Sequence, residues 1–155
     1  MIEITISDLI GMTITNIRYK YKFNGIFGWL DSHETYITLN SKININFPIP
    51  GNKNVEIIKF RGITKKISKD YQKILIGFKI IDIIEPYYNN EIDNSEMSFL
   101  QLSNNLFITE RIIAPHGTGA AGLYIYNLDE FKNMLNDWKS DNSDLKSITG
   151  NKLMI

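Results

Sequence analysis

The chain contains no cysteine, which excludes disulfides, thiolate zinc sites and cysteine catalysis. Neither charge is in surplus, because 17 Lys and Arg residues balance 17 Asp and Glu residues. Non-specific binding to nucleic acid needs a basic surplus, so we do not expect nucleic acid to be a partner. No stretch approaches the roughly 18 apolar residues of a membrane span, and the first residues lack the pattern of a signal peptide. We therefore expect a cytoplasmic protein with no membrane partner.

The remaining composition is that of an ordinary globular protein. Of 155 residues, 43% are hydrophobic and 22% are charged, which separates the chain from disordered sequences. This length is typical of one domain with a core that needs no metal or disulfide. We expect a single domain over residues 1–155.

Two stretches of the sequence resemble each other at an offset of 66 residues. Residues 9–17 align with residues 75–83, and both begin with Leu-Ile-Gly. After a three-residue slip, residues 36–40 align with residues 99–103. Self-similarity of this kind predicts an internal repeat. We place the two diverged copies at about 8–50 and 74–116, and each reads as a strand, a variable loop and a hairpin.

Each copy has the local signals of a hairpin. In the first, residues 35–39 and 43–47 flank Asn-Ser-Lys at 40–42; in the second, residues 98–102 and 106–110 flank Ser-Asn-Asn at 103–105. The flanks alternate as half-buried strands do, and Asn and Ser tolerate the positive φ of tight turns. Two more strands are expected at 55–60 and 123–126.

Two segments have helical spacing. Ile67, Tyr71 and Ile74 predict a short central helix within 64–74,. A longer amphipathic helix is expected at about 128–139, with Asn127 and Glu130 as its N-terminal capping pair. Its apolar stripe consists of Leu128, Phe131, Leu135 and Trp138,. The polar tail at 140–155 is expected to be partly flexible. The predicted fold class is thus α+β, with a mostly antiparallel sheet built from the two copies.

No sequence motif marks a catalytic, cofactor or metal site. Residues 117–122 match G-x-G-x-x-G, but a strand follows them where dinucleotide binding needs a helix. We therefore favour a structural or partner-contacting loop over nucleotide binding. His33 and His116 are far apart and neither belongs to a metal-ligand pattern. His116 could line a cleft beside the glycine loop, although a lone loop histidine is more often a surface residue. The chain is expected not to be an enzyme.

The charge pattern is more informative. Residues 59–79 contain seven basic residues and one acidic residue, whereas residues 80–110 contain six acidic residues and no Lys or Arg. Such blocks can steer a partner even at zero net charge. Within the acidic block, an acidic segment with two adjacent tyrosines is predicted to be a loop, and tyrosine is a favoured interface anchor. The candidate partner-binding residues are Glu85, Tyr87, Tyr88, Asn90, Glu91, Asp93 and Glu96.

The corresponding part of the first copy, residues 18–24, is basic and aromatic in alternation. A solvated strand face, attracted to the acidic copy, explains this pattern more simply than a nucleic-acid surface. The acidic segment could equally be a solvated face, so a structural role and a binding role both remain open for it.

The framework residues resemble a known kind of protein. They are Leu75-Ile76-Gly77 with Ile80, Tyr87-Tyr88, Asn90-Glu91, Phe99-Leu100-Gln101-Leu102 and Phe107-Ile108-Thr109-Glu110. Over roughly residues 8–135 the chain looks like small bacterial proteins similar to the immunity proteins encoded beside polymorphic or contact-dependent toxins. That resemblance implies a cytoplasmic, non-catalytic protein that binds a cognate toxin domain and blocks its active site.

Three functions are therefore open. The first is an immunity protein, in which the acidic segment occupies a basic cleft of the toxin. The second is a structural or regulatory interaction module, with a homodimer formed through exposed strand edges. The third is an enzyme with a pocket near His116.

Overall fold

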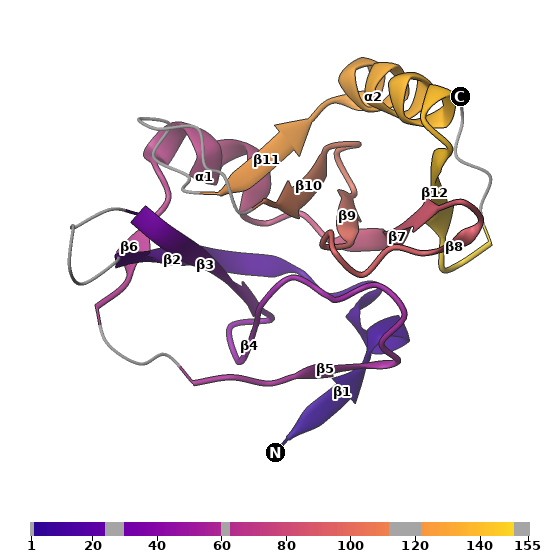
Figure 1. The fold of residues 1–155 in the computed structure, drawn as a ribbon. Helices are drawn as coiled ribbons and strands as arrows, with labels where there is room; N and C mark the ends of the chain where they lie inside the picture. The colour runs from indigo at the N-terminus through magenta and orange to yellow at the C-terminus, as the bar shows by residue number, and fades with distance from the viewer. Residues whose placement is uncertain (1, 24–29, 60–62, 112–121, 151–155) are drawn as a thin grey trace.

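The computed structural model describes residues 2–23, 30–59, 63–111 and 122–150, without the side chains of 21–23 and 30–33. Short strands dominate these residues (Figure 1). The helical elements are the 3-10 turn η1 (Ile6–Leu9), α1 (Lys69–Leu75) and α2 (Leu128–Ser140). The strands are β1 (Glu3–Thr5), β2 (Ile14–Phe23), β3 (Leu30–Leu39), β4 (Ile43–Ile45), β5 (Asn54–Glu56), β6 (Lys65–Lys66), β7 (Ile80–Tyr88), β8 (Glu91–Ile92), β9 (Phe99–Leu102), β10 (Phe107–Glu110), β11 (Leu123–Tyr126) and β12 (Ser143–Ser147).

The described strands form two main sheets. The N-terminal sheet has the order β4-β3-β2-β6, and the C-terminal sheet has the order β11-β10-β9-β7-β12, with β8 also paired to β7. β1 and β5 make a separate ribbon. Every strand pairing described is antiparallel, so the α+β, mostly antiparallel fold predicted from the sequence is confirmed. Both hairpins lie where they were expected.

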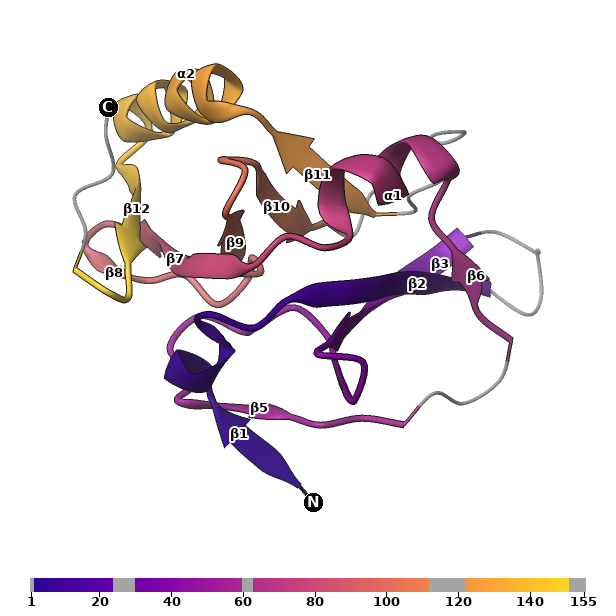
Figure 2. The same ribbon diagram turned by 180° about the vertical axis from the view of Figure 1, so that it is seen from behind.

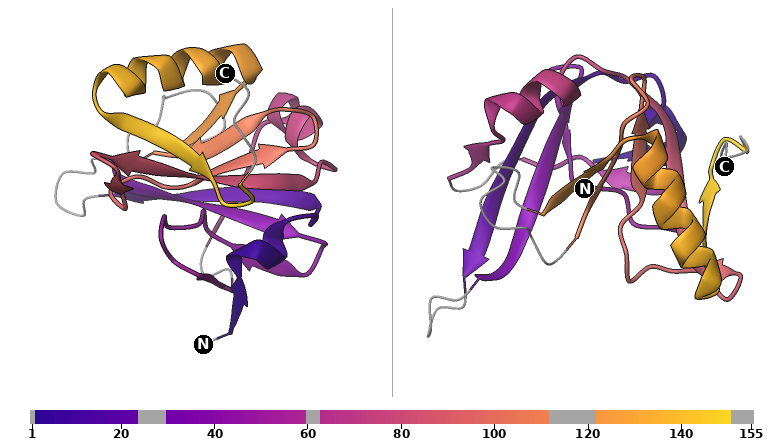
Figure 3. Two further views of the ribbon diagram at one scale, coloured as in Figure 1. Left: turned by 90° about the vertical axis from the view of Figure 1, so that its right-hand side faces the viewer. Right: turned by 90° about the horizontal axis from the view of Figure 1, so that it is seen from above.

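The core has two parts, and Figure 3 shows the layers that they join: the N-terminal sheet, the C-terminal sheet and α2. The inner faces of the two main sheets pack on each other, and this cluster includes Ile17 and Ile37 from one sheet and Ile83 and Leu100 from the other. A second cluster fills the space between the C-terminal sheet and α2. Its aromatic centre is the stack of Phe107 and Phe131, whose ring centroids are 3.9 Å apart.

The two stretches that align in sequence meet through reciprocal backbone hydrogen bonds, at the starts of β2 and β7 (Figure 2). The Gly11 N–H donates to the Ile80 carbonyl at 2.7 Å. The Gly77 N–H donates to the Ile14 carbonyl, also at 2.7 Å. Both glycines have positive φ, at 91° and 92°, a conformation that favours glycine because a Cβ is strained there. Each residue is 66 positions from its counterpart, the offset at which the two sequence stretches align.

The C-terminal helix follows its local sequence. The Asn127 side chain accepts from the Glu130 N–H at 2.9 Å, and the Glu130 carboxylate accepts from the Asn127 N–H at 3.0 Å. This reciprocal pair is the predicted capping box, which satisfies N–H groups that the helix leaves free. The predicted apolar stripe also faces the sheet, with Phe131 and Leu135 buried and Leu128 and Trp138 packed beside them.

Three elements differ from expectation. The strand expected at 55–60 is β5, which already ends at Glu56. Residues 143–147, within the tail expected to be flexible, form β12 and pair with β7. Only Leu145 of this strand is buried, so its sequence lacks the alternation that predicts a strand. The central helix begins only at Lys69, after β6. Its buried side chain is therefore Leu75, and Ile74 is 39% exposed rather than part of the predicted stripe.

Candidate functional site

The acidic segment is a hairpin and not the loop that the sequence suggested. β7 extends to Tyr88 and returns through β8 after the two-residue turn Asn89-Asn90. These asparagines have φ of 50° and 65°. Positive φ at both central residues matches a type I′ turn, whose twist suits a tight hairpin. Asparagine adopts this conformation more easily than other residues with a side chain, and this explains why polar residues continue the strand pairing here.

The hairpin separates the two adjacent tyrosines. Successive side chains of a strand point to opposite faces, so Tyr87 and Tyr88 cannot form one surface. Tyr87 is half-buried, and the Lys146 ammonium lies 4.4 Å from its ring centroid. Tyr88 is 52% exposed. The tyrosine available to a partner is therefore Tyr88, and Tyr87 mainly holds β12 against β7.

Two of the predicted acidic residues have hydrogen-bond partners within the chain, and a third is half-buried. Glu85 is half-buried and its carboxylate accepts from the Gly51 N–H at 2.6 Å. Asp93 accepts from the Ser95 N–H at 3.1 Å and closes the turn after β8. Glu96 is half-buried near Tyr126; burial is the main cause that raises the pKa of that phenol, and Glu96 adds a small contribution. The seven predicted residues therefore do not form one continuous site.

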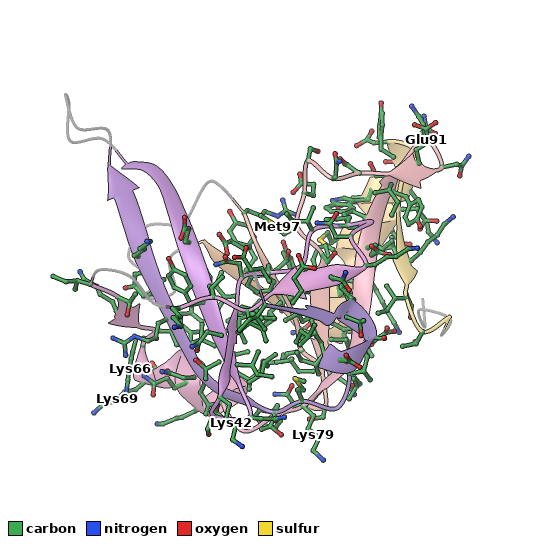
Figure 4. All side chains as sticks on the ribbon, turned by 90° about the horizontal axis from the view of Figure 1, so that it is seen from below. Lys42, Lys66, Lys69, Lys79, Glu91 and Met97 are labelled. Carbon is green, nitrogen blue, oxygen red and sulfur yellow. The ribbon has the colours of Figure 1, made fainter. Side chains whose placement is uncertain are left out.

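The exposed part of the segment is the hairpin tip, which we define as residues 88–92. Tyr88 and Glu91 are directly opposite each other and share one face. Ile92 is opposite Tyr87 on the other face and is 37% exposed. Figure 4 shows Glu91 at one extreme of the molecule, where the hairpin projects. The tip thus presents an aromatic group on one side, an aliphatic group on the other and two amides at its end.

A shallow polar hollow lies beside the tip. Its volume is about 300 Å³ and its lining residues are Asn89, Asn90, Lys139, Asn142, Ser143 and Asp144. The Asn89 N–H donates to the Asn142 carbonyl at 3.0 Å, which ties the turn to the segment between α2 and β12. Small-molecule sites are mostly apolar and enclosed. This hollow has neither property and suits a polar group of a larger partner.

A second candidate is a half-buried carboxyl group that the sequence did not single out. Glu110, at the end of β10, points toward the N-terminal sheet, where its carboxylate accepts from the Thr35 N–H at 3.2 Å. Burial raises the pKa of Glu110 to about 7, and the hydrogen bond from the Thr35 N–H opposes the shift. Glu34 adds a smaller increase by charge repulsion. The signal in the sequence was strand alternation: Ile108 faces the core, so Glu110 two residues later shares that face.

The surroundings of Glu110 do not complete a catalytic site among the described residues. Thr35, whose N–H contacts Glu110, has its Oγ1 hydroxyl buried without a hydrogen-bond partner in this part of the chain. Within the same residues, no group of three or more His, Cys, Asp or Glu side chains is placed to hold a metal ion. His116 and the glycine loop before Gly122, where the sequence suggested a cleft, lie outside the described residues, as does the His33 side chain.

A hollow of about 240 Å³ adjoins β1 and β5. Glu3 and Glu56 line it and are opposite each other across the ribbon. Two exposed carboxylates without a third ligand do not define a cation site, so we assign no role to this hollow.

Comparisons with known proteins identify no relative, because no family model, curated protein or solved structure matches the chain. The resemblance to immunity proteins therefore stays a prediction. None of the helices in the described ranges has the length and apolar character needed to cross a bilayer.

Proposed function

We propose that this chain is a non-catalytic binding protein of the immunity type, which inserts its hairpin tip into a cleft of a cognate toxin domain. The observation that supports this proposal is the tip itself. Tyr88 is 52% exposed and Ile92 is 37% exposed, on opposite faces of a strand pair. An element that projects and is apolar on both faces suits a cleft that contacts both sides.

The energetics of interfaces favour such a tip. Most binding energy in an interface comes from a few buried anchors, among which tyrosine is enriched. Tyr88 has a large area and a polar end, and it loses little conformational entropy on burial because it has two rotatable side-chain bonds. The type I′ turn pre-forms the hairpin, and pre-organisation reduces the entropy lost on binding.

Charge supports a basic partner. The one ion pair among the described residues joins Lys20 and Glu34 at 3.7 Å, so Glu91 has no lysine or arginine partner in this part of the chain. An unpaired carboxylate at a projecting tip attracts a positively charged cleft and raises the association rate. The cleft of a toxin that acts on an anionic substrate has this character.

The alternative of a module that self-associates through strand edges has less support at β12. The residues that flank β12, Asn142 and Ile148, make backbone hydrogen bonds on the β7 side of the strand. Because backbone groups alternate in direction along a strand, the Leu145 N–H points to the free edge. There it donates to the carboxylate of Asp144 at 2.8 Å. A side chain that occupies an edge donor reduces edge-to-edge pairing.

The reciprocal contact supports a duplicated scaffold. The hydrogen bonds of Gly11 and Gly77 are related by the same 66-residue offset. The register shifts that follow Ile14 in β2 and Ile80 in β7 have this offset too. We propose that both units descend from one, and that the hairpin tip is a feature of the second copy.

The test uses the toxin domain encoded nearest to this gene, produced as an inactive variant. Titration calorimetry measures its affinity for the wild-type chain, and co-expression with the active toxin measures protection of cell growth.

Tyr88→Ala is expected to weaken binding by about 30-fold, because an interface anchor contributes about 2 kcal/mol or more. Glu91→Lys is expected to slow association, and Glu56→Lys, the same charge change on exposed β5, is the control. Absence of binding to the toxin would disprove the immunity function. Full affinity in both tip variants would disprove the role of the tip.

A further inference from the structure

The lysine-rich part of the sequence forms a surface on the opposite side of the molecule from the hairpin tip. We call it the basic face and define it by five exposed lysines: Lys42, Lys66, Lys69, Lys73 and Lys79. They come from the turn after β3, from β6, from α1 and from the residue before β7. Figure 4 shows four of them (Lys42, Lys66, Lys69 and Lys79) along one side of the molecule and Glu91 at the far end.

The basic face has almost no compensating charge. Asp70 is the one carboxylate between residues 63 and 79. None of the five lysines has a carboxylate within ion-pairing distance among the described residues, where Lys20 and Glu34 make the one ion pair. Five like charges on one surface repel each other, and an anionic partner removes that repulsion.

Exposed apolar side chains lie within the same segment. Ile63 is 90% exposed and Ile74 is 39% exposed. Ile63 precedes β6, and Ile74 follows Lys73 on α1. Large aliphatic groups next to lysines are the combination by which a protein surface binds an anionic lipid bilayer: the lysines attract the headgroups and the aliphatic groups enter the acyl boundary.

From this combination we infer that the basic face docks on an anionic lipid surface. A nucleic acid fits less well, because single strands stack on exposed aromatic groups and the two aromatic residues between 63 and 79, Tyr71 and Phe78, pack against the core. The expectation of no membrane partner came from the absence of a span, which a peripheral contact does not require.

Such docking gives the protein an orientation. With the basic face on a bilayer, the hairpin tip at the far end is directed away from the lipid (Figure 4). The two surfaces share no residue, so membrane docking and partner binding can occur together. This inference is independent of the toxin and does not rest on the proposed function.

Vesicle flotation tests the inference with the purified full chain. The vesicles contain phosphatidylglycerol and phosphatidylcholine in equal amounts, or phosphatidylcholine alone, in 100 mM salt. The wild-type chain is expected to float with the anionic vesicles and not with the neutral ones. Each lysine near an anionic surface contributes roughly fivefold, so Lys66→Ala with Lys69→Ala is expected to weaken binding about 25-fold. Ile63→Ser is expected to weaken it further, and binding is expected to fall in high salt.

The matched control removes two lysines elsewhere, by Lys132→Ala with Lys139→Ala on α2, and is expected to bind like the wild type. Circular dichroism shows whether each variant is folded. No flotation with anionic vesicles, equal flotation with neutral vesicles, or equal losses in the two double variants would each overturn the inference. Tighter binding to double-stranded DNA, unaffected by Ile63→Ser, would overturn it in favour of a nucleic acid.

Discussion

Replacing Glu110 by glutamine tests the half-buried carboxyl between the sheets. Burial raises the pKa of Glu110 from 4.5 to about 7, and each pK unit corresponds to about 1.4 kcal/mol. The ionised side chain therefore costs the folded state about 3 kcal/mol. Between pH 4.5 and 7 the folded chain retains a proton that the unfolded chain has released. The contribution of Glu110 to the free energy of unfolding thus falls as the pH rises through this window and is constant above it.

Glutamine is neutral at every pH and keeps a carbonyl that can accept from the Thr35 N–H. The Glu110→Gln variant is expected to match the wild type near pH 4 and to exceed its free energy of unfolding by up to about 3 kcal/mol at pH 8. Urea denaturation from pH 4 to 8.5 measures this difference. Glu91→Gln makes the same change at the exposed tip and is expected to have little effect. A Glu110→Gln curve parallel to that of the wild type would refute the raised pKa.

Three further substitutions test features of the fold. Phe131→Ala removes the ring stacked on Phe107 at 3.9 Å and is expected to lower the free energy of unfolding by about 3–5 kcal/mol in urea denaturation. Gly77→Ala is expected to cost about 1–2 kcal/mol by the same assay, since its φ is +92° and a Cβ there meets no atom within 4 Å, which leaves backbone strain as the cause. Asp144→Ala frees the Leu145 N–H at the edge of β12 and is expected to increase self-association in sedimentation velocity; an unchanged monomer fraction would contradict the capping role.

The parts of the fold with local causes were predictable from the sequence. The capping box of α2 and its stripe of Phe131 and Leu135 depend on residues three or four positions apart,. The two hairpins have polar turns between alternating flanks,. In each of these elements, neighbouring residues determine the conformation and tertiary packing agrees with it.

The parts with non-local causes were not predictable in the same way. β12 exists because residues 143–147 pair with β7, about 60 positions earlier, and a polar sequence gives no sign of that partner. The exposure of Ile74 depends on the residue at which α1 begins. The pairing of β6 with β2 determines that residue.

The candidate site was predicted in part. The tip residues Tyr88, Asn90 and Glu91 were identified from composition, which detects exposed charge and aromatic groups. Composition does not report that Tyr87 contacts Lys146 or that Glu85 accepts from Gly51, because both contacts are made with distant segments. The raised pKa of Glu110 depends on burial by the other sheet, and a sequence without known strand partners does not give it.

The reciprocal bonds of Gly11 and Gly77 have a kinetic consequence. The residues at the start of β2 donate to and accept from the residues at the start of β7. Neither main sheet can therefore complete its first strand without the other. These bonds close loops of more than 60 residues, and contacts so distant in sequence form slowly because chain entropy is lost before they form. Refolding is therefore expected to be slow and cooperative, with no stable half-molecule. If the chain is cut between the N-terminal and the C-terminal sheet, each fragment alone is expected to remain unfolded. The two fragments are expected to regain structure when they are mixed.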